Sequence, residues 1–227
     1  FDLFPECVHE DPGEIKPFEH EDGEYDLVIL AYQVWFLSPS LPMQAFLQSH
    51  EAQELLKDKP VITLIGCRNM WLMAQEKMKE LIASVGGVLI DNVALVDKGS
   101  AFETFITTPV WLLTGKKDSF LGLTPAGVAD EEIEACDRFG ERICKCLDDG
   151  YDVRKETMLK GLKAVYIDEK IITTERVAIR SFRLWGKLFR LAGKRGSIKR
   201  VPILIIYVIF LITLIITVFP ISYTVIS

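Results

Sequence analysis

Short apolar runs alternate with segments of helical periodicity along the first 150 residues of this chain. Predominantly apolar runs occupy 27–31, 61–65 and 88–96, and each follows charged residues, proline or glycine. Such runs are typical of strands that are buried on both faces of a parallel sheet. The pattern therefore predicts an α/β fold in which right-handed crossovers join three parallel strands.

Helical spacing fills the connections between these strands. A helix is expected over 42–56, and another, capped by Asn69, is expected to bury the apolar residues that recur every three or four positions, namely Trp71, Ala74, Met78, Leu81 and Val85. The polar residues of that second helix are expected to face water, namely Gln75, Glu76, Lys77, Lys79 and Glu80.

A later helix is predicted to begin near Asp130 and to bury one further stripe, made of Ile133, Cys136, Gly140, Ile143 and Leu147. Before it, residues 98–127 form a long connection. Connections of that length often cover a site or contact a partner.

The chain ends in an apolar segment. Val201 to Phe219 are 19 residues without a charge, and a helix of that length spans about 28 Å, against about 30 Å for the hydrocarbon core of a bilayer. We therefore expect a transmembrane anchor over 201–226. A soluble core helix is the alternative, although such a helix usually carries polar residues on one face.

The segment before the anchor is strongly basic. Residues 176–200 hold nine basic side chains and no acidic one, and six of these recur at helical spacing, namely Arg176, Arg180, Arg183, Lys187, Arg190 and Lys194. Beside this row runs an aromatic row that includes Phe182, Trp185 and Phe189. The pairing predicts a juxtamembrane helix with its cations toward anionic headgroups and its aromatics toward the acyl chains. The alternative is a charged helix packed on the globular domain.

Charge divides the chain in two. Residues 1–175 carry 32 acidic against 17 basic side chains, which excludes nucleic acid as a favoured partner. The positive-inside rule places this acidic part in the cytoplasm. We expect one domain over 1–150, followed by a linker over 151–175. The five cysteines lack metal-ligand spacing and are consistent with a reducing compartment, so no metal site is predicted.

Candidate site residues follow the first two strands, because ligands of open parallel sheets bind outside the carboxyl ends of the strands. After the first strand, Trp35 can stack on a flat ring, and the hydroxyl of Ser38 or Ser40 can donate to phosphate or ring oxygens. The alternative is that Trp35 and Phe36 only plug the end of the sheet.

Two residues after the second strand suggest catalysis. Arg68 is costly to bury without a partner, so it is a candidate ligand for an anion or a carbonyl. Cys67 lies beside this cation and a predicted helix start, both of which lower the pKa of a thiol, so a nucleophilic role is conceivable beside that of an inert buried cysteine.

Several strings of the chain resemble a known family. FPECV, LVILAYQVWFLSPSLP, IGCRNMWLMAQEK and SFRLWGKL, which begin at Phe4, Leu27, Ile65 and Ser181, are similar to strings of bacterial membrane-anchored dialkylresorcinol-condensing enzymes. The loops after the two strands also resemble the loops that wrap the flavin ring in flavodoxin-like proteins. This resemblance implies a flavodoxin-like parallel sheet and FMN contacts from Gln33, Trp35, Phe36, Ser38, Ser40, Gly66, Asn69 and Trp71.

One departure from the flavodoxin-like pattern concerns the phosphate. Residues 1–26 contain no apolar strand followed by the Thr/Ser- and Gly-rich loop that would hold the FMN phosphate at a helix N-terminus. We therefore expect the N-terminal βαβ part of the fold to be missing from this chain and to lie in a preceding segment. Without it, the first strand would be an exposed edge.

Three functional hypotheses follow. The leading one is a domain anchored in the bacterial inner membrane that carries out FMN-dependent redox chemistry on an apolar quinone or aromatic-lipid substrate. The second is a flavin-free enzyme that condenses or cyclises acyl-derived chains, with Arg68 polarising a carbonyl and Cys67 reacting covalently. The third is a membrane-tethered binding module without catalysis.

Overall fold

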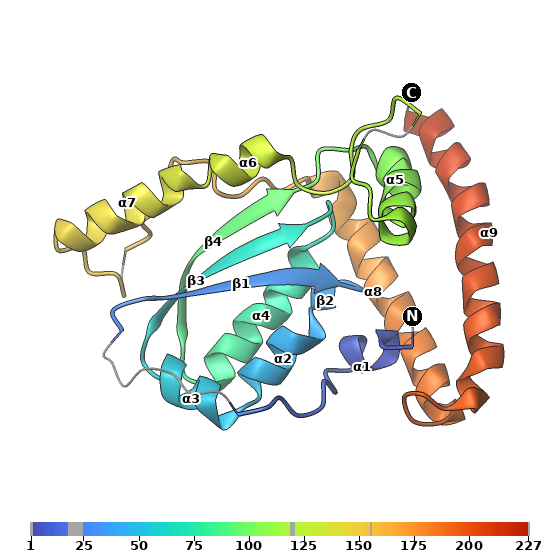
Figure 1. The fold of residues 1–227 in the computed structure, drawn as a ribbon, viewed down its shortest axis with the longest axis horizontal. Coiled ribbons are helices and arrows are strands. Elements are labelled where there is room, and N and C mark those ends of the chain that lie inside the picture. Colours follow the sequence, from blue (N-terminus) through green and yellow to red (C-terminus); the bar gives the residue numbers. More distant parts are fainter. Residues whose placement is uncertain (1, 18–24, 119–120, 155, 227) are drawn as a thin grey trace.

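A computed structural model describes residues 2–17, 25–118, 121–154 and 156–226. Its centre is a four-stranded sheet in the order β2-β1-β3-β4, made of β1 (Val28–Trp35), β2 (Ser38–Pro39), β3 (Pro60–Cys67) and β4 (Val88–Val96) (Figure 1). β1, β3 and β4 are parallel, as predicted, and each contains one of the three apolar runs. The two-residue β2 was not predicted. It pairs antiparallel with the end of β1 through a tight turn.

Three helices cover one face of the sheet, namely α2 (Leu41–Leu47), α3 (His50–Leu56) and α4 (Leu72–Ser84) (Figure 1). The single helix expected over 42–56 is divided, because Ser49 begins a new helix by accepting a hydrogen bond from the Ala52 N–H at 3.2 Å. The apolar stripe predicted for α4 is buried against the sheet.

Two predictions for α4 are wrong. Asn69 does not cap it, since the helix begins after Trp71 and the Glu175 carboxylate accepts from the Met73 N–H at 2.8 Å. Gln75 and Lys77 do not face water, because α4 has neighbours on more than its apolar side. Lys77 is covered by the N-terminal segment, where it pairs with Glu10 at 2.6 Å.

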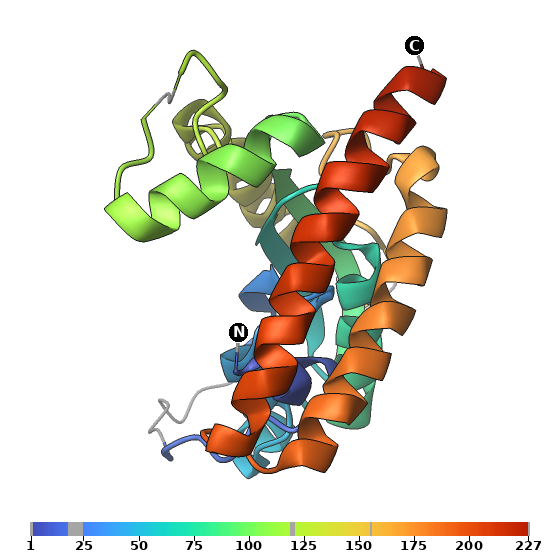
Figure 2. The same cartoon turned by 90° about the vertical axis from the view of Figure 1, so that its right-hand side faces the viewer.

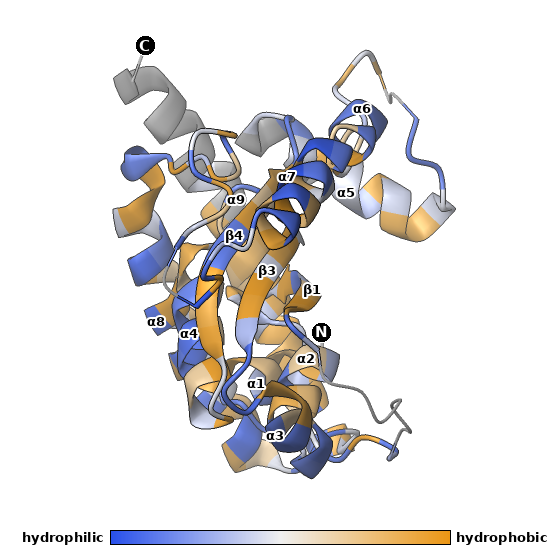
Figure 3. Ribbon diagram, turned by 90° about the vertical axis from the view of Figure 1, so that its left-hand side faces the viewer, coloured by the Kyte–Doolittle hydropathy of each residue, from blue (hydrophilic) through white to orange (hydrophobic). Residues whose placement is uncertain are grey.

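The other face of the sheet is covered over β3 and β4 by α7 (Asp137–Asp148), which follows the short α6 (Asp130–Glu134) (Figure 3). Phe139, Ile143 and Cys146 are its buried residues. The predicted stripe is therefore wrong at Ile133, Gly140 and Leu147, which are exposed. The prediction assumed one continuous helix, but the helix breaks between α6 and α7. The residues after the break therefore face a different direction from the one that continuous helical spacing predicts.

A helical hairpin stands at the side of the sheet to which the strands' carboxyl ends point (Figures 1 and 2). Its members are α8 (Glu169–Ala192), a short 3₁₀ turn (Ile198–Arg200) and α9 (Val201–Ile226). The N-terminal α1 (Phe4–Val8) packs against it. The rings of Phe4 and Tyr207 stack with centroids 5.0 Å apart, and Phe189 meets both edge-on. This aromatic cluster is a third core beside the two on the sheet.

The orientation predicted for the α8 aromatics is wrong. Phe182, Trp185 and Phe189 pack against α1, α9 and the β1–β2 turn, so they do not face acyl chains. The expected alternative, a charged helix packed on the domain, describes the arrangement. The basic row is exposed from Arg176 to Lys194.

The described part of α9 has two unlike faces. Its inward face packs on α1 and α8 around Tyr207, whereas large aliphatic side chains of its outward face are exposed, among them Ile205, Ile206, Ile209, Ile212 and Leu214. The transmembrane anchor expected over 201–226 is not supported, because within the described residues no helix has both the length and the apolar character that crossing a membrane would require.

The long connection after β4 contains a helix of its own, α5 (Ala101–Thr114). A capping box begins this helix: Ser100 accepts from the Glu103 N–H, and Glu103 accepts from the Ser100 N–H. These bonds, with two more from Thr124, lower the pKa of Glu103 to about 2. The first turn of α5 lies beside the carboxyl end of β3, where Thr104 contacts Arg68.

Candidate functional site

The turn between β1 and β2 is strained. Phe36 and Leu37 have φ of 52° and 58°, the left-handed region that two-residue hairpin turns normally fill with glycine or asparagine. Packing keeps the turn in place, because Leu37 is buried and the Phe36 ring lies 5.1 Å from the ring of Phe4. Phe36 is therefore a core residue here, as the plugging alternative expected.

An open groove of about 450 Å³ lies beside this turn. We call it the sheet groove, and its lining residues are Ala31, Tyr32, Gln33, Trp35, Ser40, Pro42, Leu64, Gly66 and Leu95. It lies at the β1 side of the sheet, where Ile29, Ala31 and Gln33 are exposed. The fold thus brings together four of the residues that the resemblance implied for ring contact, namely Gln33, Trp35, Ser40 and Gly66.

Two features give the sheet groove its shape. The indole N–H of Trp35 donates to Oε1 of Gln33 at 3.3 Å, which links the aromatic side chain to a polar neighbour. A Cβ placed on Gly66 would meet no atom within 4 Å, so the glycine leaves open space above the sheet. A flat ring could lie on this glycine with the indole at its side.

Ser38 is not part of this groove. Its side chain is buried, and its Oγ has no hydrogen-bond partner among the described residues. Close by, the Gln44 amide donates to the carbonyls of Pro39 and Cys7 at 2.7 and 2.9 Å. This part of the loop fastens the hairpin to α1 and is closed to a ligand.

Arg68 lies where β3 ends and contacts α5. Its Nη2 donates to Oγ1 of Thr104, while its Nε is buried without a partner among the described residues. Burial lowers the pKa of Arg68, and the negative charge of Asp97 opposes that shift. The Asp97 carboxylate itself accepts from the backbone N–H groups of Gly99 and Gly127 at 2.8 and 2.9 Å.

Cys67 packs against the core between the sheet and α4 and is poorly suited to attack. Burial, and secondarily the Glu175 carboxylate, raises the pKa of the Cys67 thiol to about 12. A thiol with that pKa is protonated at neutral pH, whereas the thiolate is the nucleophile. The arrangement therefore favours the inert cysteine over the nucleophilic one.

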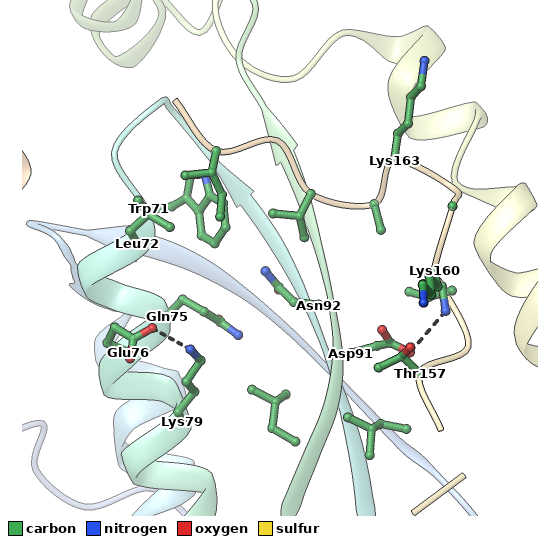
Figure 4. Close-up of a pocket in the computed structure, with 17 residues that line it drawn as sticks. Trp71, Leu72, Gln75, Glu76, Lys79, Asp91, Asn92, Thr157, Lys160 and Lys163 are labelled. Atoms are coloured by element: carbon green, nitrogen blue, oxygen red, sulfur yellow. Dashed lines mark hydrogen bonds and ion pairs between the residues drawn. The ribbon is translucent and has the colours of Figure 1, made fainter. Parts of the chain in front are cut away.

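The last two residues of the predicted set lie apart from the sheet groove. Trp71 is buried at the start of α4 and lines a different groove, between α4 and β4 (Figure 4). Asn69 is half-buried in the loop before it. The eight residues implied by the resemblance are thus divided among two grooves, a core and a loop.

The sequence reasoning missed two acidic residues near the strand ends. Asp97 directly follows β4, so the strand-end rule that selected Arg68 could have found it. Glu175 gave no such signal, because only the packing of α8 brings it to α4. Among the described residues, no group of three histidine, cysteine or acidic side chains is arranged to hold a metal ion.

Comparison with known proteins adds no relative: no family model, curated protein or solved structure matches this chain.

Proposed function

We propose that this chain is a membrane-associated, flavodoxin-like α/β domain that binds the ring of an apolar quinone or aromatic lipid in the sheet groove. The observation that carries the proposal is the groove itself, where Trp35, Gln33 and the open space above Gly66 meet on the sheet. An indole can stack on a ring, and the amide of Gln33 can bond a ring oxygen.

The lining of the groove favours an uncharged ring. None of the described residues that line it carries a charge, so an anionic group bound there would lose water without gaining a counter-ion. FMN fits this lining through its ring, and its phosphate would need partners outside the groove. If FMN occupies the groove, Trp35, Gln33 and Gly66 would hold and orient its ring, and the flavin would supply electron transfer to a quinone that approaches from outside the groove.

Membrane association rests on the helical hairpin. The exposed Arg and Lys row of α8 suits anionic headgroups, and the exposed aliphatic face of α9 suits the acyl chains. Both helices stand at the side of the sheet to which the strands' carboxyl ends point (Figure 1). An apolar substrate could therefore reach the site from the bilayer, at the cytoplasmic face that the basic residues indicate.

The ring-binding part is tested with 5-fluorotryptophan, because the four tryptophans lie in four different surroundings: the sheet groove, the groove between α4 and β4, α5 and the aromatic cluster. A short-chain ubiquinone, an alkylresorcinol and FMN are titrated into the full chain in detergent while the ¹⁹F spectrum is recorded. We expect the resonance of Trp35 to shift and those of Trp71, Trp111 and Trp185 to stay.

Gly66→Val tests whether the open space above Gly66 holds the ring. Valine is favourable in a strand and meets no neighbour at its Cβ, so the variant should fold and bind the ring at least about tenfold more weakly, a loss of about 1.4 kcal/mol. Gly140→Ala, on the exposed side of α7, is the control. Unchanged affinity in Gly66→Val, or a silent Trp35, would refute ring binding in this groove.

Membrane association is tested separately by vesicle flotation of the full chain. Arg180→Glu, Arg183→Glu and Lys187→Glu together should weaken binding to phosphatidylglycerol vesicles by at least about 3 kcal/mol, a hundredfold or more, because three attractions are lost and three repulsions are added. The control reverses three exposed lysines elsewhere, Lys57, Lys145 and Lys160. If α9 enters the hydrocarbon, high salt should leave the wild-type chain on the vesicles and detergent should release it. Equal loss in both triple variants would count against a specific basic surface.

Arg68 supports a second candidate, the condensing or cyclising enzyme. Its buried Nε, which has no partner among the described residues, is a donor that a substrate carbonyl could satisfy. In that case Arg68→Ala should abolish product formation from acyl-derived substrates while the fold persists, and Cys67→Ala should not. Full activity in Arg68→Ala would remove the candidate.

A further inference from the structure

The helix α5 buries polar side chains and exposes apolar ones. Thr104 and Thr107 are each 3% exposed, whereas Trp111, Leu112 and Leu113, near the carboxyl end of the helix, are 38%, 77% and 87% exposed. A helix on a protein surface in water normally has the opposite arrangement, with its apolar side toward the core. The outward side of α5 therefore suits an apolar environment better than water.

Contacts in the amino-terminal half of α5 fix the rotation of the helix about its axis. Arg68, at the end of β3, donates to Oγ1 of Thr104. Oε1 of Glu103 accepts from the N–H and from the hydroxyl of Thr124 at 3.2 and 3.0 Å. The Thr107 hydroxyl donates to the carbonyl of Glu103 at 3.0 Å, so this buried side chain has a partner within the helix. With the threonines held inward, the last turn is held with its apolar residues outward.

The carboxyl end of α5 projects from the body of the protein. Within the described part of the chain, no other helix or strand packs extensively along α5. The helix ends at Gly115, and the chain then turns back, where Lys117 donates to the carbonyl of Val128 at 2.9 Å. In Figure 2, α5 extends sideways beyond α9 and is not covered by it. The exposed apolar turn is thus free to meet a surface outside the chain.

Two features favour a lipid bilayer as that surface. The first is position, because α5 and the exposed aliphatic face of α9 stand on the same side of the sheet, beyond the carboxyl ends of the strands (Figure 1). The second is composition. Tryptophan prefers the boundary between headgroups and acyl chains, and between Glu103 and Asp118 the chain carries two lysines and no acidic residue, which suits anionic headgroups.

We propose that the last turn of α5 inserts into the bilayer as a second membrane contact, with Leu112 and Leu113 among the acyl chains and Trp111 at the level of the headgroups. The inference rests on the membrane association proposed above and extends it from the helical hairpin to α5. Because α5 begins beside the end of β3, its insertion also holds that end of the sheet near the bilayer.

The position of Trp111 is tested on the full chain, labelled with 5-fluorotryptophan, in nanodiscs of phosphatidylcholine and phosphatidylglycerol. A lipid that carries a doxyl spin label high on its acyl chain should broaden the ¹⁹F resonance of Trp111 more strongly than that of Trp71, which is buried in the protein. Trp111→Phe assigns the resonance. Equal broadening of the two tryptophans in a chain bound to the nanodiscs would overturn the insertion of α5.

The contribution of the two leucines is tested by Leu112→Ser combined with Leu113→Ser. Both side chains are largely exposed, so the variant should fold as the wild type does. Its partition onto vesicles should fall at least about tenfold, because two aliphatic side chains no longer leave water. The control is Ile133→Ser with Leu147→Ser, which replaces two exposed aliphatic residues of α6 and α7, away from α9 (Figure 1). No loss in the α5 variant, or equal loss in both variants, would refute the proposal.

The outcomes separate this inference from the membrane association of the hairpin. If the charge-reversed α8 variant loses binding and the α5 variant does not, the hairpin binds the bilayer and the insertion of α5 is wrong. If only the α5 variant loses binding, α5 inserts and the basic row of α8 is not needed. A chain that does not bind vesicles at all would overturn both. If the α5 variant keeps its vesicle affinity but dissociates a wild-type dimer, the turn contacts a second copy of the chain and the proposal is wrong.

Discussion

Arg200 and Glu6 form a buried, bidentate ion pair although 194 positions separate them in the chain. Nη2 of Arg200 lies 2.6 Å from Oε1 of Glu6, and Nη1 lies 3.2 Å from Oε2. The remaining N–H groups of the guanidinium donate to the carbonyl of Gly193 and to Asp2. This pair fastens α1 to the junction of α8 and α9, and it explains how the N-terminal segment becomes part of the helical hairpin.

Removing one partner of this pair should loosen the hairpin. Glu6→Ala leaves a buried guanidinium without its carboxylate, which costs about 3 kcal/mol in comparable sites. We expect the free energy of unfolding to fall by about that amount and hydrogen exchange to accelerate in the first turns of α9. The double variant with Arg200→Met should lose less than the two single variants added together. Strict additivity would mean that the pair is not coupled.

Deletion of the C-terminal segment should disturb the aromatic cluster. A chain without 201–227 loses Tyr207 from the aromatic cluster as well as the exposed face of α9. We expect such a truncated protein to be destabilised, as measured by thermal unfolding against the full chain. For that reason the charge-reversed full chain is the cleaner test of membrane association. A truncated protein as stable as the full chain would show that α9 contributes nothing to the core.

A buried chain of hydrogen bonds runs from Tyr32 to Asn92 through Gln75 and Thr63, with distances of 2.7, 3.0 and 2.8 Å. Tyr32→Phe removes the hydroxyl and leaves Oε1 of Gln75 buried without its donor, at a cost of about 1–3 kcal/mol. Because the Gln75 amide would then be free to rotate, the side-chain amide signal of Asn92 should also shift in a ¹H–¹⁵N spectrum. Thr107→Val on α5 is a control that removes a hydroxyl outside this chain. An unshifted Asn92 signal would show that Tyr32 does not orient it.

The buried carboxyl group of Glu175 should make the free energy of unfolding depend on pH. Burial raises the pKa of its carboxyl above the ordinary value of 4.5, so the folded protein holds this proton more tightly than the unfolded chain. Its contribution to stability is therefore fully present below about pH 4.5 and is lost as the pH rises through the folded-state pKa. Glu175→Gln imitates the protonated acid and should become more stable relative to wild type as the pH rises. Urea unfolding across this range measures it, and a pH-independent difference would contradict the prediction.

The buried and the exposed cysteines should differ in their rate of alkylation. Burial raises the pKa of Cys7 and of Cys67 to about 12, whereas Cys144 is exposed. Iodoacetamide at neutral pH should label Cys144 first and reach Cys67 only slowly, with a rate that grows with pH. Labelling of all five cysteines in urea is the control. Rapid labelling of Cys67 in the folded protein would revive a nucleophilic role for it.

The three strands could be predicted because the runs at 27–31, 61–65 and 88–96 are locally apolar. Burial on both faces describes β3, whereas Ile29 and Ala31 of β1 are exposed and most of β4 is half-buried. The Trp71-to-Val85 stripe followed from helical spacing alone. The errors occur where a helix breaks or acquires a second neighbour. The phase of 130–147 was lost at the break before Asp137, and Gln75 and Lys77 are buried by segments that local spacing does not reveal.

The candidate site shows the same division. Gln33, Trp35, Ser40 and Gly66 line one groove, because carboxyl ends of parallel strands share an edge, and their contact with a ring stays a prediction. Proximity to a strand end could not show that Phe36 and Ser38 lie outside this groove. The hairpin turn between β1 and β2 reverses the chain there and directs both side chains into the protein.

The amino-acid sequence by itself determined the parallel strands, the charge division and the apolar C-terminal helix, because each depends on side chains that are neighbours in the chain. Only the tertiary structure decided what the helix faces meet. The α8 aromatics became core residues because α1 packs against α8 and α9, where Glu6 pairs with Arg200 194 positions later in the chain. The Asn92 amide is oriented because Tyr32, Gln75 and Thr63 come from three different elements. Contacts between distant segments arise from side-chain packing and from buried polar groups that need hydrogen-bond partners. The periodicity of a short stretch of sequence does not predict them.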